Sequence, residues 1–334
     1  MQEIPPFIAY RMDGTSQASS LAFEDSVAGA GDKRPEAATD PSATGFTWVH
    51  LQRDDPRTLQ WLAASGLDPF VHDALMADET RPRCTFHGDG AIVNLRGVNL
   101  NPGARPDDMV SIRFWVEADQ VVSVWIRPLR AVADQFEAIA RQHAPISPGD
   151  LLAKLAIRLA DRAEPTVGDL ADRIDALEDA ILDQGADFSR GEHAAVRRSA
   201  ITLRRFMGPQ RDALRALEFE ELDWMRDKDR SRLREATERL TRFGEELDAL
   251  RDRSKVMHDQ IADARAELLN RNMMVLSAVT AIFLPLGLIT GLLGINVGGI
   301  PGANNSAAFL IVSALLLLLA LGQLVLFRRF GILR

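Results

Sequence analysis

The chain has 334 residues and a formal net charge of −8, from 39 basic and 47 acidic side chains, and 46% of its residues are hydrophobic. An acidic surface attracts cations and repels nucleic acid, so no nucleic-acid partner is expected. The single cysteine, Cys84, excludes an internal disulfide and is typical of a reducing compartment. No Ser/His/Asp set, phosphate loop or paired-carboxylate site stands out, so neither an enzyme activity nor a bound cofactor is expected.

Residues 1–146 are predicted to form a cytoplasmic α/β domain. Short β-branched and aromatic runs with turn signals between them predict strands at residues 46–51, 83–87, 91–98, 110–117 and 121–127. Helical patterns lie among the strands at residues 56–64, 69–77 and 129–143. Residues 14–44 are rich in Ala, Ser, Gly, Asp and Pro, which predicts a mobile segment.

From residue 147 the pattern is helical. Residues 147–225 are predicted to form cytoplasmic helices, with apolar positions at three- and four-residue steps over residues 151–163, 167–182 and 192–217. A long stalk helix is expected over residues 226–272. Because no proline follows before Pro285, this helix is expected to continue into the apolar stretch after it, and 226–294 would then be a rod of roughly 100 Å at 1.5 Å per residue.

Residues 273–327 contain no charged side chain and no histidine. Two apolar runs, 273–294 and 307–327, are each near the ~20 residues that a membrane-spanning helix needs. The Gly-, Pro- and Asn-rich residues 295–306 between them predict a tight outer loop, and residues 328–334 form a short tail. Arginines flank the spans while the loop carries no charge, so both termini are expected to be cytoplasmic in a multi-pass protein of the inner membrane. No secretory signal is apparent near the first residue.

Two membrane helices in one chain cannot enclose a water path, so transport would require several chains around an axis. Small and polar residues of the first span recur at steps of three and four and share one helix face; they are Asn270, Met273, Ser277, Thr280, Leu284, Gly287 and Gly291. This face is predicted to line a pore, while the almost wholly apolar second span faces lipid. The alternative is that the small residues only allow membrane helices to pack closely.

Several motifs together resemble the CorA metal-ion transporter superfamily, in particular its ZntB zinc-transport branch. In the membrane part these are Asn270-Arg-Asn-Met-Met-Val-Leu-Ser, the tripeptide Gly294-Ile295-Asn296 and the following Val297-Gly-Gly-Ile-Pro-Gly. In the soluble part they are Thr80-Arg-Pro-Arg and Asn94-Leu-Arg-Gly-Val. The resemblance covers nearly the whole chain apart from residues 14–44.

The resemblance implies a funnel-shaped homopentamer whose long helix lines the pore, with Gly294, Ile295 and Asn296 at the outer mouth. Five Asn296 side chains would give a ring of neutral amide oxygens, which can bind the water shell of a hydrated cation without stripping it. Ile295 stands where magnesium-transporting relatives usually have Met, and the loop lacks their acidic residues. The ZntB branch therefore implies Zn²⁺ as the transported ion and coupling to protons, with a CorA-type channel for Mg²⁺, Co²⁺ or Ni²⁺ as the alternative.

Acidic residues extend the pore-face spacing back along the stalk. Counting back from Asn270, the positions are Ala266, Asp263, Asp259, Val256, Asp252 and Glu245, four of which are carboxylates. In an assembly of several chains such residues would form rings that concentrate cations in an inner vestibule. His258 adjoins Asp259 as a further metal candidate. The alternative is that these acids are solvated or paired with bases such as Arg251 and Lys255.

Other possible zinc ligands carry less weight. His193, beside Glu192 at a helix start, is a candidate for regulatory zinc. Cys84 and His87 have a ligand-like spacing, but positions three apart in a strand point to opposite faces. The competing function is that of a membrane-anchored metal sensor or scaffold. The polar face of the first span argues against it, because an anchor does not need such a face.

Overall fold

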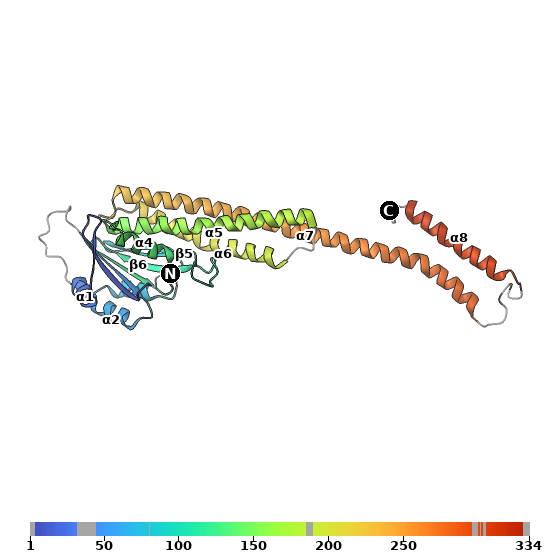
Figure 1. The fold of residues 1–334 in the computed structure, drawn as a ribbon, viewed down its shortest axis with the longest axis horizontal. Coiled ribbons are helices and arrows are strands. Elements are labelled where there is room, and N and C mark those ends of the chain that lie inside the picture. Colours follow the sequence, from blue (N-terminus) through green and yellow to red (C-terminus); the bar gives the residue numbers. More distant parts are fainter. Residues whose placement is uncertain are drawn as a thin grey trace. The chain divides into compact units, whose positions relative to one another are not determined.

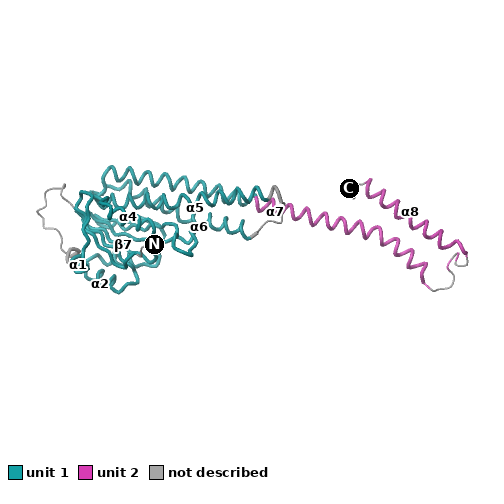
Figure 2. Tube along the Cα trace, in the orientation of Figure 1, with its two compact units in different colours: residues 1–180, 189–256 teal, residues 181–188, 257–334 magenta. Residues whose placement is uncertain are grey.

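The computed structural model describes residues 4–31, 45–79, 81–184, 190–295, 300, 302 and 305–329. The chain divides into two compact units (Figure 2). The first comprises residues 1–180 and 189–256, and the second comprises residues 181–188 and 257–334. The first unit contains the β-sheet and its covering helices, and the second contains the two apolar helical segments.

The sheet of the first unit has seven strands in the order β2-β1-β3-β7-β6-β5-β4. The strands are β1 Phe7–Met12, β2 Ala18–Ser20, β3 Phe46–Gln52, β4 Arg83–His87, β5 Gly90–Gly97, β6 Val110–Val116 and β7 Gln120–Trp125. β3 and β7 run parallel, with Trp48 opposite Val121, and the other neighbouring pairs are antiparallel. All five strands predicted from the sequence are confirmed, with ends within two residues.

Within residues 14–44, which were predicted to be a mobile segment, the structure has a strand and a helix. β2 pairs with β1 through Tyr10 and Ser20, and helix α1 (Phe23–Gly31) follows. The ring of Phe23 lies 5.2 Å from that of Phe7, and Ser26 Oγ accepts a hydrogen bond of 3.0 Å from Trp61 Nε1. These few apolar and aromatic anchors order a segment whose average composition is that of a loop. Residues 32–44 lie outside the described part of the chain.

Helices cover both faces of the sheet (Figure 1). On one face, α2 (Pro56–Ala64) and α3 (Pro69–Met76) bury Trp61 and Leu75 against Val49 and Leu51 of β3. On the other face, α4 (Arg130–Ala140) stacks Phe136 on Trp48, with ring centroids 4.8 Å apart. Alternate residues of β3 therefore serve two cores, as the period of two in a strand requires.

His50 belongs to the core on the α4 face. Its Nδ1 lies 2.7 Å from Ser123 Oγ, and its ring stacks on Trp125. Complete burial lowers the pKa of His50 to about 3, so the imidazole is neutral at physiological pH. The structure thus gives His50 a packing role.

Long helices follow α4: α5 Pro148–Gln184, α6 Arg190–Phe219, α7 Asp227–Gly294 and α8 Ala308–Arg329. The sequence predicted two helices, 151–163 and 167–182, where the structure has the single helix α5. Pro165 removes one backbone donor from α5. The helix continues because Ala163 and Val167, on either side of the proline, are both buried, so packing outweighs the lost hydrogen bond.

Two buried carboxylates lie where α5 and α7 begin. Asp150 is paired with Lys154 at 2.7 Å and with Arg232. Asp229 is 2% exposed and accepts hydrogen bonds from Ser147 Oγ at 3.1 Å and from the Arg226 amide at 3.3 Å. Burial, followed by the nearby Asp150 charge, raises the pKa of Asp229.

Replacing Asp229 by Asn is expected to stabilise the first unit at pH 7. A raised pKa means that the folded protein takes up the proton before the unfolded chain does, so this group's stabilisation is present at low pH and is lost as pH rises through the folded pKa. Asn keeps an oxygen acceptor and carries no charge. Urea unfolding of the full chain in detergent, followed by tryptophan fluorescence, should show a higher midpoint at pH 7 and a difference that shrinks towards pH 4.

The matched control is Asp227→Asn, which removes an exposed acid from the same helical turn. Its midpoint should follow the wild type at both pH values. A lower midpoint for Asp229→Asn than for wild type at pH 7 would contradict the charge argument.

Candidate cation pathway

The second unit presents two helices that are apolar on their outer surfaces. The best 18-residue windows in α7 and α8 have mean hydropathies of 2.1 and 2.7, and 6% and 0% of these windows are buried. Large apolar side chains are exposed along both helices, as for Leu284 at 71% and Phe309 at 79%. By length and composition both helices can cross a membrane, where such surfaces contact lipid.

α8 shields one side of the first span. Ala278 is 4% exposed, and half-buried residues continue the same side at Ile282, Pro285, Leu286 and Ile289. The residues predicted to line a pore are all exposed: Asn270, Met273, Ser277, Thr280, Leu284, Gly287 and Gly291. At about 100° per residue, the two sets are centred about 150° apart around the helix. The chain therefore leaves the polar face of its own first span uncovered.

One hydrogen bond joins the two spans. Pro285 has no backbone N–H, so the carbonyl of Ala281, four residues earlier, lacks its helical donor. Gln323 of α8 supplies one, since its Nε2 donates to the Ala281 oxygen at 3.2 Å. A side-chain amide thus replaces the backbone hydrogen bond that the proline removes.

Threonine hydroxyl groups in the first span donate hydrogen bonds to backbone carbonyls of the same helix. Thr280 Oγ1 donates to the Leu276 carbonyl at 2.8 Å, and Thr290 Oγ1 donates to the Leu286 carbonyl at 2.9 Å. The threonine protons are thereby used, and the oxygens remain as acceptors. A Cβ atom added at Gly287 or Gly291 would meet nothing within 4 Å, so packing within the single chain does not require these glycines.

The predicted pore mouth is partly described. Gly294 is the last residue of α7, and Ile295 directly after it is 51% exposed. Asn296 lies outside the described residues. The candidate tripeptide therefore starts where the first span ends, and the position of its amide remains a prediction.

The stalk carboxylates are exposed in the single chain. Asp252 forms an ion pair with Arg251 at 2.9 Å, which agrees with the alternative that the stalk acids are paired with bases. The Asp252 side chain is nevertheless 69% exposed. His258, Asp259 and Asp263 are also exposed. In the described part of the chain, no three His, Cys, Asp or Glu residues come together as metal ligands. Any cation site formed by these residues would therefore need side chains from other chains.

The remaining zinc candidates are engaged elsewhere. Burial raises the pKa of the Cys84 thiol to about 12, and His87 pairs with Asp68 at 3.4 Å and packs on the ring of Phe70. His193 is buried, with Nε2 2.6 Å from the Ser254 carbonyl, so it joins α6 to α7. These contacts give Cys84, His87 and His193 structural roles.

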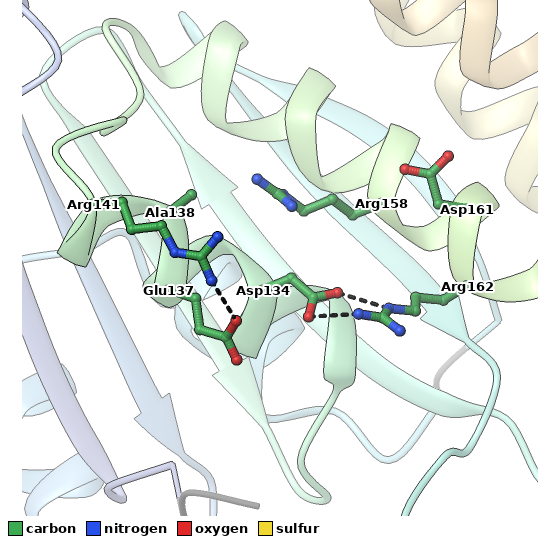
Figure 3. Close-up of a pocket in the computed structure, with 7 residues that line it drawn as sticks. All are labelled: Asp134, Glu137, Ala138, Arg141, Arg158, Asp161 and Arg162. Carbon is green, nitrogen blue, oxygen red and sulfur yellow. Dashed lines mark hydrogen bonds and ion pairs between the residues drawn. The ribbon is translucent and has the colours of Figure 1, made fainter.

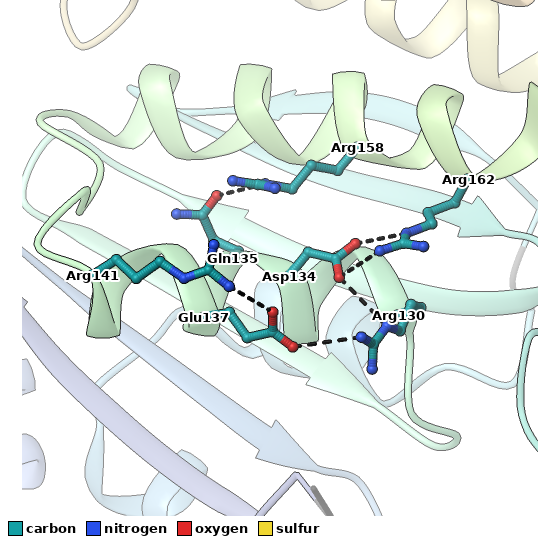
Figure 4. Close-up of polar contacts among 7 residues, drawn as sticks. All are labelled: Arg130, Asp134, Gln135, Glu137, Arg141, Arg158 and Arg162. Atoms are coloured by element: carbon teal, nitrogen blue, oxygen red, sulfur yellow. Dashed lines mark hydrogen bonds and ion pairs between the residues drawn. The ribbon is translucent and has the colours of Figure 1, made fainter. Parts of the chain in front are cut away.

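A charged cavity of about 390 Å³ lies between α4 and α5 (Figure 3). Its carboxylates are neutralised in place: Asp134 accepts two hydrogen bonds of 2.8 Å from Arg162, and Glu137 pairs with Arg141 at 3.3 Å. Arg158 donates to the neutral Gln135 at 3.2 Å (Figure 4). With three guanidinium groups facing three carboxylates, this cavity is not suited to a divalent cation.

Known proteins with similar sequences match nearly the whole chain. Residues 43–329 match the family model "CorA-like Mg2+ transporter protein". The chain is 39% identical to "Divalent cation transporter CmaX" of Pseudomonas aeruginosa, over 84% of this chain and 86% of that protein. It is 36% identical to "Zinc transport protein ZntB" of Yersinia enterocolitica, over 94% of this chain and 92% of that protein.

Solved structures agree with these matches. Full-length CmaX superposes with a TM-score of 0.80 at 34% identity, covering 98% of this chain and 99% of that one. The cytoplasmic domain of ZntB from Vibrio parahaemolyticus gives 0.65 at 25% identity, covering 78% and 99%. The CorA magnesium transporter of Methanocaldococcus jannaschii gives 0.78 at 18% identity over the full length of both chains, which is a likeness of fold.

Gln323→Leu is expected to weaken the contact between α7 and α8. It leaves the Ala281 carbonyl without a donor in an apolar environment, and hydrogen bonds between membrane helices contribute about 0.6 kcal/mol on average and at most about 1.7 kcal/mol. In a Pro285→Ala background the backbone regains an N–H at this position that can donate to that carbonyl, so the same Gln323→Leu change should cost much less. Thermal unfolding followed by circular dichroism, for the wild type, the two single variants and the double variant, measures the coupling between Gln323 and Pro285. Equal losses in both backgrounds would show that Gln323 does not replace the missing donor.

Neutralising Asp259 and Asp263 together to Asn is expected to lower the apparent affinity for Zn²⁺. Exposed charges act through a screened field, so we expect a loss of roughly three- to tenfold at low salt, shrinking as ionic strength rises. Calorimetric zinc titration of the full chain at two salt concentrations measures the effect. Glu267→Gln, which removes an exposed acid beside the predicted pore face, is the control. Superimposable isotherms for wild type and the double variant would exclude the acidic rings.

Proposed function

The chain belongs to the CorA-like Mg²⁺ transporter family and is a divalent cation transporter with ZntB zinc transport proteins among its relatives, and we propose that it carries Zn²⁺ through the axis of a homopentamer. Its fold is CorA-like: an N-terminal α/β domain, a long helix and two C-terminal apolar helices. Inner-membrane transport is the setting of this family. In the proposal both termini lie in the cytoplasm, as does the part comprising residues 1–272.

The observation that carries the proposal is the uncovered polar face of the first span. α8 shields the opposite side, and the seven residues predicted to line a pore share one of the sides that stay exposed. Contact with lipid alone would not require amide and hydroxyl groups on that face. Placed around an axis, five such faces would enclose a path lined by one amide, two hydroxyls and two glycines from each chain, in addition to Met273 and Leu284. The second spans would then face lipid.

The choice of ion rests on the mouth of this path. Gly294, Ile295 and Asn296 start a loop without any charged side chain over residues 295–306. Neutral amides suit a cation that keeps its water shell. The ZntB relatives favour Zn²⁺, and Mg²⁺, Co²⁺ or Ni²⁺ transport is the alternative. Proton coupling is part of the proposal, and because residues 273–327 contain no titratable side chain, water in the path would have to carry the proton.

Asn296→Ala tests the proposal directly. Losing the amide ring removes the contact to the hydrated ion, so zinc flux into liposomes should fall at least tenfold, while native mass spectrometry should still show five chains. Zinc-sensing dye inside the liposomes reports the flux, with and without a pH gradient. Asn304→Ala changes another amide of the same loop and should keep the wild-type rate.

Each outcome separates the alternatives. Wild-type flux in Asn296→Ala would remove Asn296 from the site. Magnesium flux with no zinc flux would replace the proposed ion. An intact complex that transports neither ion would favour a membrane-anchored sensor or scaffold, and a transporting monomer would contradict the pore.

A further inference from the structure

A second cavity lies at the carboxyl ends of the parallel strand pair. β3 and β7 end at Gln52 and Trp125, which are opposite each other in register, and both residues line a cavity of about 400 Å³. In sheets of mixed α/β proteins, ligands bind outside the carboxyl ends of parallel strands, where the following loops diverge. The volume lies within the range of small-molecule sites. This cavity has no part in the proposed cation path.

One residue that lines this cavity carries a buried donor without an acceptor. Trp125 is 3% exposed, and its indole N–H has no hydrogen-bond partner. Buried donors are nearly always paired, because an unpaired one has lost its hydrogen bond to water without replacement. A ligand in this cavity that accepts from Trp125 would satisfy the donor.

The start of α4 adds positive potential to the same cavity. Leu129 occupies the N-cap position and provides no side-chain hydrogen bond, so the first N–H groups of this 11-residue helix are not capped by a side chain there. Leu129 and Arg130 both line the cavity. A helix N-terminus favours negatively charged groups. The loop before it is held in shape by Asn101, whose Nδ2 donates to the Pro128 carbonyl at 3.0 Å.

Arg130 has donor capacity to spare. Its distances to Asp134 and Glu137 are 3.4 and 3.5 Å (Figure 4), longer than the 2.7–2.9 Å of a strong charge-assisted hydrogen bond. An acidic group in the cavity could therefore contact Arg130 in addition to the helix N-terminus. All three features call for a hydrogen-bond acceptor with negative charge.

A cavity with both apolar and polar walls adjoins the first one. It has a volume of about 590 Å³ and shares Ile4, Arg130 and Ala133 with the cavity at Trp125. Its walls include Phe7 of β1 and Phe136 of α4. An aliphatic chain would remove these apolar surfaces from water.

We propose that the two cavities together bind an amphipathic organic acid with one aliphatic chain. Its acidic head accepts hydrogen bonds from Trp125 Nε1 and from the start of α4 beside Arg130, and its chain lies between β1 and α4. A carboxylate and a phosphate monoester share this chemistry.

Calorimetry on the full chain in lipid nanodiscs tests the proposal with four probes. Octanoate and octyl phosphate are the two kinds of acid, 1-octanol has the chain without the charge, and acetate has the charge without the chain. At least one of the two acids should bind saturably with one site per chain and at least tenfold more tightly than 1-octanol or acetate. The tighter of the two acids identifies the head group. No saturable binding of either acid, or equal binding of 1-octanol, would overturn the proposal.

Trp125→Phe provides the site-specific test, because it keeps an aromatic ring and removes the N–H. It should weaken binding of the acid at least threefold. Trp115→Phe is a matched control, since the Trp115 indole N–H is also buried and unpartnered but does not line either cavity. Ala133→Phe, which fills space shared by both cavities, should abolish binding. Equal affinities for Trp125→Phe and Trp115→Phe would overturn the assignment of the head group to Trp125.

Discussion

The hydrocarbon of a membrane offers no hydrogen-bond partners, so every backbone group within it must be satisfied by protein. Pro285 breaks that rule in the first span, and Gln323 restores it by donating to Ala281. This contact ties α8 to one side of α7. The position of α8 in turn decides which side of the first span stays open, and that open side carries the amide, hydroxyl and glycine positions on which the transport proposal depends. A single proline and a single glutamine thus fix the side of the helix that is available to neighbouring chains.

Charge is arranged differently in the two units. The first unit is rich in ion pairs between long helices, as between Arg253 and Glu178 at 2.6 Å, and in the α4–α5 cavity acids and bases neutralise each other. Exposed pairs of this kind contribute little individually to stability. The excess of acidic side chains still lies in the first unit, because the second unit has five acids and five bases. Within the second unit, Asp259 and Asp263 lie near the start of the uncharged stretch. In the transport proposal, these two acids would attract cations through their position beside the first span.

Much of the architecture could be predicted from periodicity. The five central strands, α2 and α3 follow alternation and turn signals closely, whereas the pore-lining role of the face from Asn270 to Gly291 stays a prediction. β2 and α1 were missed because a few contacts, such as Phe7 with Phe23, order a segment of loop-like composition. α5 continues through Pro165 because tertiary packing outweighs a local signal. The cavity at Trp125 has no local signal, since it exists only where β3 and β7, distant in sequence, become parallel neighbours.

The lone thiol has a practical consequence for mapping the path. Burial raises the pKa of Cys84 to about 12, so almost none of it is thiolate at neutral pH, and it reacts slowly with maleimides and methanethiosulfonates. The native chain is accordingly a nearly silent background for cysteine scanning. Cysteines introduced one at a time from Met273 to Gly291 would report, by their labelling rates, which positions of the helix meet water and which meet lipid.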